Sequence, residues 1–231
     1  MRLGLYGVPA GEGAGRETLA AGLASALAAA GAVVIELGER ARGKAGTSCD
    51  AVIVVGDDGQ TVDGADGGAG SRWSIDAFAR AGGPVLAIGA GVRVLCRLGQ
   101  LPGQVNESAR EDGASGPVVS HVRVEGRATP FTSAIPAGRV LRWTPAVAAA
   151  RAAAAPATLE WQLPDLAALS TRGQVIFRAC DAAGGTRRHS SIAGVSNQRG
   201  NVLGLLAPVE IVAGDGEQLL RSLRLHLRAS R

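Results

Sequence analysis

The chain has 231 residues, of which 46% are hydrophobic, 19% charged and only 3% aromatic. This composition excludes a disordered chain and disfavours a platform that stacks nucleic-acid bases on aromatic side chains. The net charge of +4 is carried by arginines scattered along the sequence, whose small clusters we interpret as solvated surface. We therefore expect no nucleic-acid partner.

In the first half of the chain, apolar runs alternate with helical stretches. The pattern predicts strands over residues 3–8, 32–37, 51–55 and 84–88. It predicts helices over residues 18–30 and 74–80, and a third helix that ends at Leu98. Strands that are apolar throughout and separated by helices favour a parallel sheet covered on both faces.

The second half has strand-like runs with few helices between them, at residues 117–124, 139–143, 174–179 and 202–206. They predict an antiparallel extension joined to the main sheet, closed by a helix over residues 216–227. Two stretches rich in Gly, Asp and Ser predict loops, and an Ala-rich stretch is either a short helix or a loop: residues 59–70, 106–116 and 146–155. Because no linker interrupts the pattern, we expect one domain over residues 1–231.

Three cysteines, Cys49, Cys96 and Cys180, show no tight spacing. An odd number without such spacing is typical of a reduced protein and predicts neither a disulfide framework nor a zinc site. The sequence shows no targeting segment and no apolar stretch of about 18 residues, so no membrane span is expected. We expect a cytoplasmic protein with no metal and no cofactor.

A glycine-rich segment over residues 7–16 follows the first predicted strand and precedes the first helix. A loop in this position can hold a phosphate group. A phosphate-binding loop of the common kind needs Lys followed by Ser or Thr, and Arg16-Glu17 stands there instead. We interpret the segment as a plain strand-to-helix turn.

Residues 84–95 have the strand–turn–helix pattern of a nucleophile elbow. Such a turn lifts one side chain above the sheet, beside backbone N–H groups that stabilise an anion. The apex needs Ser or Cys, but here it is Gly89. The sequence thus predicts the geometry of the elbow without its reactive atom.

This elbow is followed by Gly-Gln-Leu-Pro-Gly at residues 99–103, and in order by further motifs at residues 122–125, 129–133, 174–178, 191–195 and 197–204. In this combination the sequence resembles the glutaminase subunit of phosphoribosylformylglycinamidine synthase, a class I glutamine amidotransferase. The resemblance implies an α/β, flavodoxin-like fold: a mainly parallel sheet flanked by helices, with an antiparallel extension. It also implies a partner, a large ATP-dependent synthetase subunit that receives ammonia.

The family uses a Cys nucleophile, a His base and a Glu that orients the His. Its elbow reads Cys-Asn-Gly, and here it reads Gly89-Ala90-Gly91. Its Pro-His-Pro-Glu segment corresponds to residues 207–210, so the base position holds Pro208 and only Glu210 matches. The resemblance therefore implies that no catalytic residue set is intact.

Two more stretches differ from the family. Its oxyanion loop begins Pro-Gly-Gly, whereas Asp57, Asp58 and Gly59 stand at this loop here, and two carboxylates would repel a developing oxyanion. Its polar Ala-His-Gly-Glu-Gly stretch corresponds roughly to residues 145–149, which are Pro, Ala and Val. Cys96 lies two helical turns beyond the elbow and cannot substitute there. Loss of the nucleophile alone costs a factor of about 10⁶ in turnover, so we predict no glutaminase activity.

Three functions remain open on the sequence. The first is a catalytically inactive glutaminase-like subunit that docks on an ATP-dependent formylglycinamidine-synthase-type amidoligase, in purine or purine-like biosynthesis. The second is a repurposed enzyme, for which Asp57, Asp58, Glu210 and His121 are the available titratable groups. The third is a regulatory module that binds a metabolite.

Overall fold

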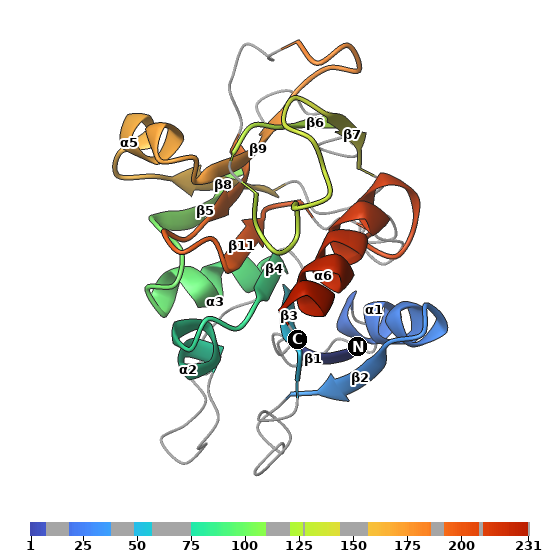
Figure 1. The fold of residues 1–231 in the computed structure, drawn as a ribbon. Coiled ribbons are helices and arrows are strands. Elements are labelled where there is room, and N and C mark those ends of the chain that lie inside the picture. The colour runs from blue at the N-terminus through green and yellow to red at the C-terminus, as the bar shows by residue number, and fades with distance from the viewer. Residues whose placement is uncertain are drawn as a thin grey trace.

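A nine-stranded sheet forms the centre of the molecule, in the order β2-β1-β3-β4-β11-β10-β9-β6-β7 (Figure 1). The computed structural model describes residues 1–7, 19–37, 49–56, 75–109, 121–126, 128–143, 157–185, 192–207 and 210–230. The glycine-rich segment beyond Gly7 and residues 59–70, 117–120 and 146–155 lie outside this part of the chain.

The first five strands of the sheet are parallel: β2 Val33–Glu36, β1 Arg2–Gly7, β3 Ala51–Gly56, β4 Val85–Gly89 and β11 Val202–Leu205. Both β3 and β4 are buried along their whole length, which explains why their sequences are apolar at every position. The order β2-β1-β3-β4-β11 is the flavodoxin-like order. The predicted parallel sheet is therefore confirmed. Residues 202–206 were predicted in the antiparallel extension, but β11 pairs parallel with β4 and is the fifth strand of the parallel part.

The remaining strands form the predicted antiparallel extension: β10 Ile192–Ser196, β9 Val175–Ala179, β6 His121–Val124 and β7 Val140–Arg142. The last of them, β7, is an edge strand. Asp215 protects this edge, because its Oδ2 accepts the backbone N–H of Arg142 at 2.7 Å. Asp215 belongs to a 3₁₀ turn, η2 Gly214–Gly216, that leads into the last helix.

Helices cover both faces of the sheet (Figure 1). On one face, α1 Leu19–Ala29 and α6 Glu217–Ala229 bury leucines such as Leu27 and Leu223 against the core. On the other face, α2 Ile75–Arg80 and α3 Gly91–Arg97 bury Ile75 and Leu95. The three helices predicted in the first half and the closing helix are all present.

Four elements were not predicted, and one of them is β10 of the extension. The strands β5 Gln104–Ala109 and β8 Ala157–Gln162 form a separate antiparallel pair, so the loop predicted over residues 106–116 is wrong for residues 106–109. The polar sequence of β5 does not predict a strand by itself. It forms one because it pairs with β8, which lies far away along the chain. A short helix, α5 Leu166–Thr171, begins where Asp165 accepts the backbone N–H of Ala168 at 2.8 Å.

Candidate functional site

The predicted elbow is present at the end of β4. The chain turns sharply at Gly89, whose φ is +60°, a value that side-chain-bearing residues rarely adopt. Ala90 then donates its backbone N–H to the carbonyl oxygen of Gly56 at 3.0 Å, and α3 begins at Gly91. Because Gly56 is also the register partner of Gly89, the ends of β3 and β4 hold the turn from both sides.

A close approach of α3 to β3 explains the glycine at the third position of the elbow. A Cβ atom on Gly91 would lie 2.5 Å from the carbonyl oxygen of Val54 and 2.8 Å from its carbonyl carbon. Val54 lies within the fully buried β3, where the backbone cannot withdraw cheaply. Glycine at this position is therefore a packing requirement and not a catalytic one.

The elbow presents backbone groups without a reactive side chain. Gly89 and Gly91 have none, and Ala90 is fully buried and carries only a methyl group. A covalent mechanism needs a thiolate or alkoxide at the apex, positioned by a base. The turn therefore has the shape of a nucleophile elbow, and residues 89–91 carry no nucleophilic side chain.

Glu210 lies beyond the end of β11, at the same edge of the sheet as the elbow. The strands β11 and β4 are parallel, with Leu205 opposite Ile88, so both chains leave the sheet on this side. The carboxylate of Glu210 accepts the backbone N–H of Val212 at 3.1 Å. Its carboxylate thus caps its own loop, and Pro208, at the base position, lies outside the described residues.

The other predicted site segments lie outside the described residues. Asp57, Asp58 and Gly59 lie outside the described residues, but they directly follow Gly56, which pairs with Gly89. Residues 145–149 also lie outside, two positions after the buried Trp143. The last described residue before the predicted oxyanion loop, Gly56, therefore lies beside the elbow.

His121 and Glu210, two of the titratable groups available to a repurposed enzyme, are not brought together. His121 lies on β6, which is three strands from β11, the strand that precedes Glu210. Three inter-strand spacings amount to about 14 Å. Among the residues that the structure describes, no three His, Cys, Asp or Glu side chains group closely enough to hold a metal ion.

The three cysteines do not replace the missing nucleophile. Burial raises the pKa of the Cys96 thiol to about 12, so this group stays protonated and unreactive near neutral pH. Burial also raises the pKa of Cys49, on the approach to β3, and Cys180 is buried next to β9. Cys96 lies on α3, seven residues past Gly89, and packs partly buried against the core.

The hairpin between β10 and β11, which carries the motif at residues 197–204, is a structural brace. Asn201 is 7% exposed and donates its Nδ2 hydrogens to the carbonyl oxygens of Ala79, at 2.8 Å, and Gly83, at 2.9 Å. Ala79 lies in the last turn of α2, and Gly83 lies in the turn that follows this helix. Within the turn, the Oδ1 of Asn197 accepts the backbone N–H of Gly200 at 2.8 Å. This motif therefore fixes α2 to the sheet.

The motif at residues 129–133 is also used internally. Thr129 and Thr132 are buried, and the backbone N–H of Thr129 donates to the Oγ1 of Thr132 at 2.9 Å. One residue beyond the motif, the backbone N–H of Ala134 donates to the Oγ of the buried Ser222 on α6, at 3.2 Å. The segment thus ties the antiparallel extension to α6.

Sequence reasoning missed the role of Asp76 on α2. Its Oδ1 accepts hydrogen bonds from the Nε of Arg80 at 2.9 Å and from the Nε2 of Gln100 at 2.7 Å. The four-residue spacing of Asp76 and Arg80 on a helix was a usable signal. The contact with Gln100 joins α2 to the segment after α3. It has no signal in the sequence, because the two residues are far apart along the chain.

The sequence is similar to subunits of one biosynthetic enzyme. Phosphoribosylformylglycinamidine synthase subunit PurQ of Nitrobacter winogradskyi is 36% identical over 167 residues, which cover 67% of this chain and 68% of that protein. The same subunit of Symbiobacterium thermophilum is 35% identical over 167 residues, 67% of each chain. This chain belongs to the PurQ family. No family model matches it.

Solved structures agree with the PurQ assignment at the level of the fold. The structure of PurLQS from Thermotoga maritima matches with a TM-score of 0.63 at 21% identity, over 98% of each chain. The glutaminase domain of CTPS from Trypanosoma brucei matches with a TM-score of 0.53 at 12% identity, over 100% of this chain and 94% of that one. The class I glutamine amidotransferase fold is therefore confirmed. None of the helices in the described ranges is long and apolar enough to cross a membrane.

Proposed function

We propose that this chain is a catalytically inactive, glutaminase-like subunit that docks on an ATP-dependent amidoligase of the formylglycinamidine synthase type. Its PurQ relatives are named as subunits of phosphoribosylformylglycinamidine synthase, which supports a place in such a complex, in purine or purine-like biosynthesis. The observation that carries the inactive role is the elbow, which has the required backbone shape and glycine at its apex.

The chemistry of glutamine hydrolysis supports this proposal. The family reaction forms a thioester with a cysteine at the apex, and Gly89 offers no atom that could form one. Glu210 can orient an imidazole, but proline stands at the base position. Loss of the nucleophile alone costs about 10⁶ in turnover, and here the nucleophile and base positions have both changed.

A docking role needs the shape of the subunit and not its active site. The motifs at residues 129–133 and 197–204 stabilise that shape through buried hydrogen bonds. Their match to the family is therefore explained by folding, and they give no information on where a partner binds. A stable complex would bury at least about 1,200 Å² on other surfaces.

We expect the reconstituted complex to use free ammonia and not glutamine. The test combines the chain with the formylglycinamidine synthase large subunit of the same organism and supplies either ¹⁵N-amide glutamine or ¹⁵N-ammonium. Nitrogen from ammonium should enter the product, and glutamate release should stay at background. The PurQ protein of Nitrobacter winogradskyi with its own large subunit serves as the positive control. Glutamate release above background by our chain would contradict the inactive role.

A variant that restores both catalytic side chains tests how far the site has diverged. Gly89→Cys combined with Pro208→His is expected to leave glutamine hydrolysis at background, because Asp57 and Asp58 stand at the oxyanion-loop positions and disfavour negative charge there. Gly89→Ala with Pro208→His is the matched control without a thiol. Glutamate release by the cysteine variant alone would show that the site is only disarmed.

A further inference from the structure

One face of the antiparallel extension carries several arginines on neighbouring strands. Along β6 the side chains alternate: Val122 and Val124 are buried, whereas His121 and Arg123 are partly exposed on the other face. The register places Arg123 opposite Arg178 of β9, and His121 opposite Arg142 of β7. Cross-strand partners share one face of a sheet.

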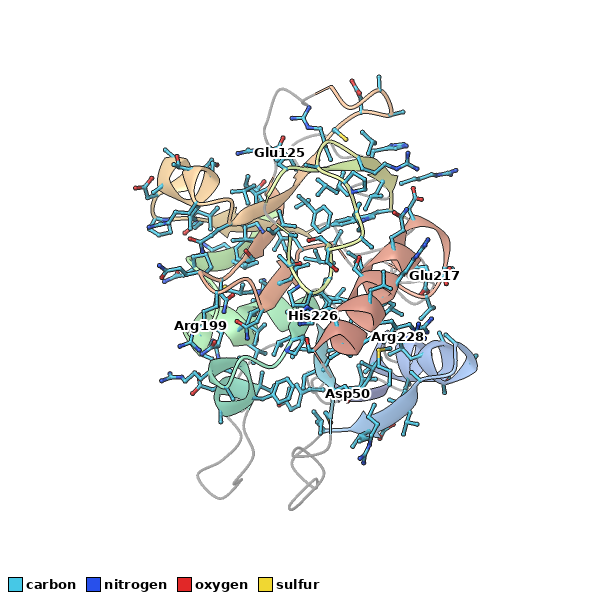
Figure 2. All side chains as sticks on the ribbon, viewed as in Figure 1. Asp50, Glu125, Arg199, Glu217, His226 and Arg228 are labelled. Carbon is cyan, nitrogen blue, oxygen red and sulfur yellow. The ribbon has the colours of Figure 1, made fainter. Side chains whose placement is uncertain are left out.

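We define the basic face by Arg123, Arg142, Arg178 and Glu125, the residue that follows β6. Together with Asp215, whose carboxylate accepts the backbone N–H of Arg142, three arginines and two carboxylates give a net charge of +1 (3 − 2 = 1). Figure 2 shows Glu125 at the end of the molecule that is formed by the extension.

The pairing of Arg123 with Arg178 costs stability unless it is compensated, because like charges directly opposite each other in a sheet repel. Glu125 bridges them: its Oε1 accepts from the Nε of Arg123 at 3.1 Å, and its Oε2 from the Nε of Arg178 at 2.5 Å. One carboxylate offsets one of the two charges. Folding alone would be served better by a pair of opposite charge.

Further contacts hold both guanidinium groups in place without burying them. Arg123 donates from Nη1 to the carbonyl oxygen of Gly184 at 2.8 Å, and Arg178 donates from Nη2 to the Oγ of Ser170 at 3.2 Å. Their side chains remain 33% and 17% exposed. These arginines are therefore fixed in advance, which lowers the entropy lost when a ligand binds.

We propose that the basic face is a docking surface for an acidic patch on the partner subunit. This inference rests on the proposed function. The exposed guanidinium of Arg142 can bind a carboxylate through paired hydrogen bonds, and Arg123 and Arg178 add positive charge beside it. A basic patch facing an acidic one also accelerates association. The face spans β9, β6 and β7, two inter-strand spacings or about 10 Å. That width suits a protein surface with several carboxylates better than one small anion.

Arg142 is the residue to test, because it is exposed and Glu125 makes its bridges with the other two arginines. Arg142→Glu reverses the charge at this position. Arg142→Gln only removes the charge, so it adds no carboxylate that would repel the neighbouring carboxylate of Asp215. The matched control is Arg228→Glu, an exposed position on α6 that Figure 2 shows well away from Glu125. Unfolding curves of all variants verify that each is folded.

The measurement is the association rate with the formylglycinamidine synthase large subunit of the same organism, at 50 and 300 mM NaCl. We expect Arg142→Glu to slow association roughly tenfold at 50 mM, Arg142→Gln to slow it less, and Arg228→Glu to change it by less than about twofold. The difference should shrink at 300 mM because salt screens exposed charges.

Two results would overturn the inference. If Arg142→Glu and Arg228→Glu slow association equally, or if neither does, the basic face is not the docking surface although the complex exists. If the unmodified chain does not bind the large subunit at either salt concentration, the proposed function itself fails, and this inference fails with it.

Discussion

Gly91→Ala is expected to lower the free energy of unfolding by about 3 kcal/mol or more. The new methyl group would lie 2.5 Å from the carbonyl oxygen of Val54, well inside van der Waals contact. Overpacking a core typically costs 1–3 kcal/mol, and here the obstacle is buried backbone and not a flexible side chain. The gain in helix propensity from alanine, about 1 kcal/mol, is too small to compensate.

The matched control for this prediction is Gly22→Ala. Gly22 lies within α1, and a Cβ atom there would have nothing within 4 Å. This change should therefore raise the free energy of unfolding by about 0.5–1 kcal/mol. Urea unfolding followed by circular dichroism measures both variants. A Gly91→Ala protein as stable as the parent would show that α3 does not approach β3 as closely as the structure describes.

Elements are predictable from sequence where the signal lies within one short stretch of the chain. The strands β3 and β4 were predictable because every one of their residues is buried, which leaves an apolar run. The strands β5 and β8 were not, because their pairing joins Gln104 to Gln162, 58 positions apart (162 − 104 = 58), and mixes polar with apolar residues. Such a strand depends on a partner that no local window contains.

The same distinction between local signals and distant contacts applies to the candidate site. The elbow was predictable because its strand, turn and helix lie within residues 84–95, and the absence of a nucleophile needs only the identity of Gly89. The functions of the matching motifs were not predictable. A motif match cannot distinguish a residue that docks a partner from one that braces the fold, since that depends on contacts with distant residues.

Asn201→Ala is expected to destabilise the protein by about 3 kcal/mol. The change removes the donors to the carbonyl oxygens of Ala79 and Gly83, and the acceptor for the Nδ2 of Asn197 at 3.0 Å. Each net hydrogen bond contributes about 1 kcal/mol, and a buried carbonyl left without a donor costs more. Asn201→Asp should be at least as damaging, because a carboxylate oxygen would then face two carbonyl oxygens.

Arg199→Ala is the control in the same hairpin. Its exposed side chain makes one hydrogen bond, from Nη1 to the carbonyl oxygen of Arg80 at 2.6 Å, so its loss should cost less than about 1 kcal/mol. Urea unfolding measures the free energy of unfolding of both variants. The affinity of the folded protein for the large subunit then distinguishes a residue that braces the fold from one that docks the partner. A brace predicts that Asn201→Ala loses stability while folded molecules bind unchanged. A docking residue would show the reverse, because affinity would fall at nearly constant stability.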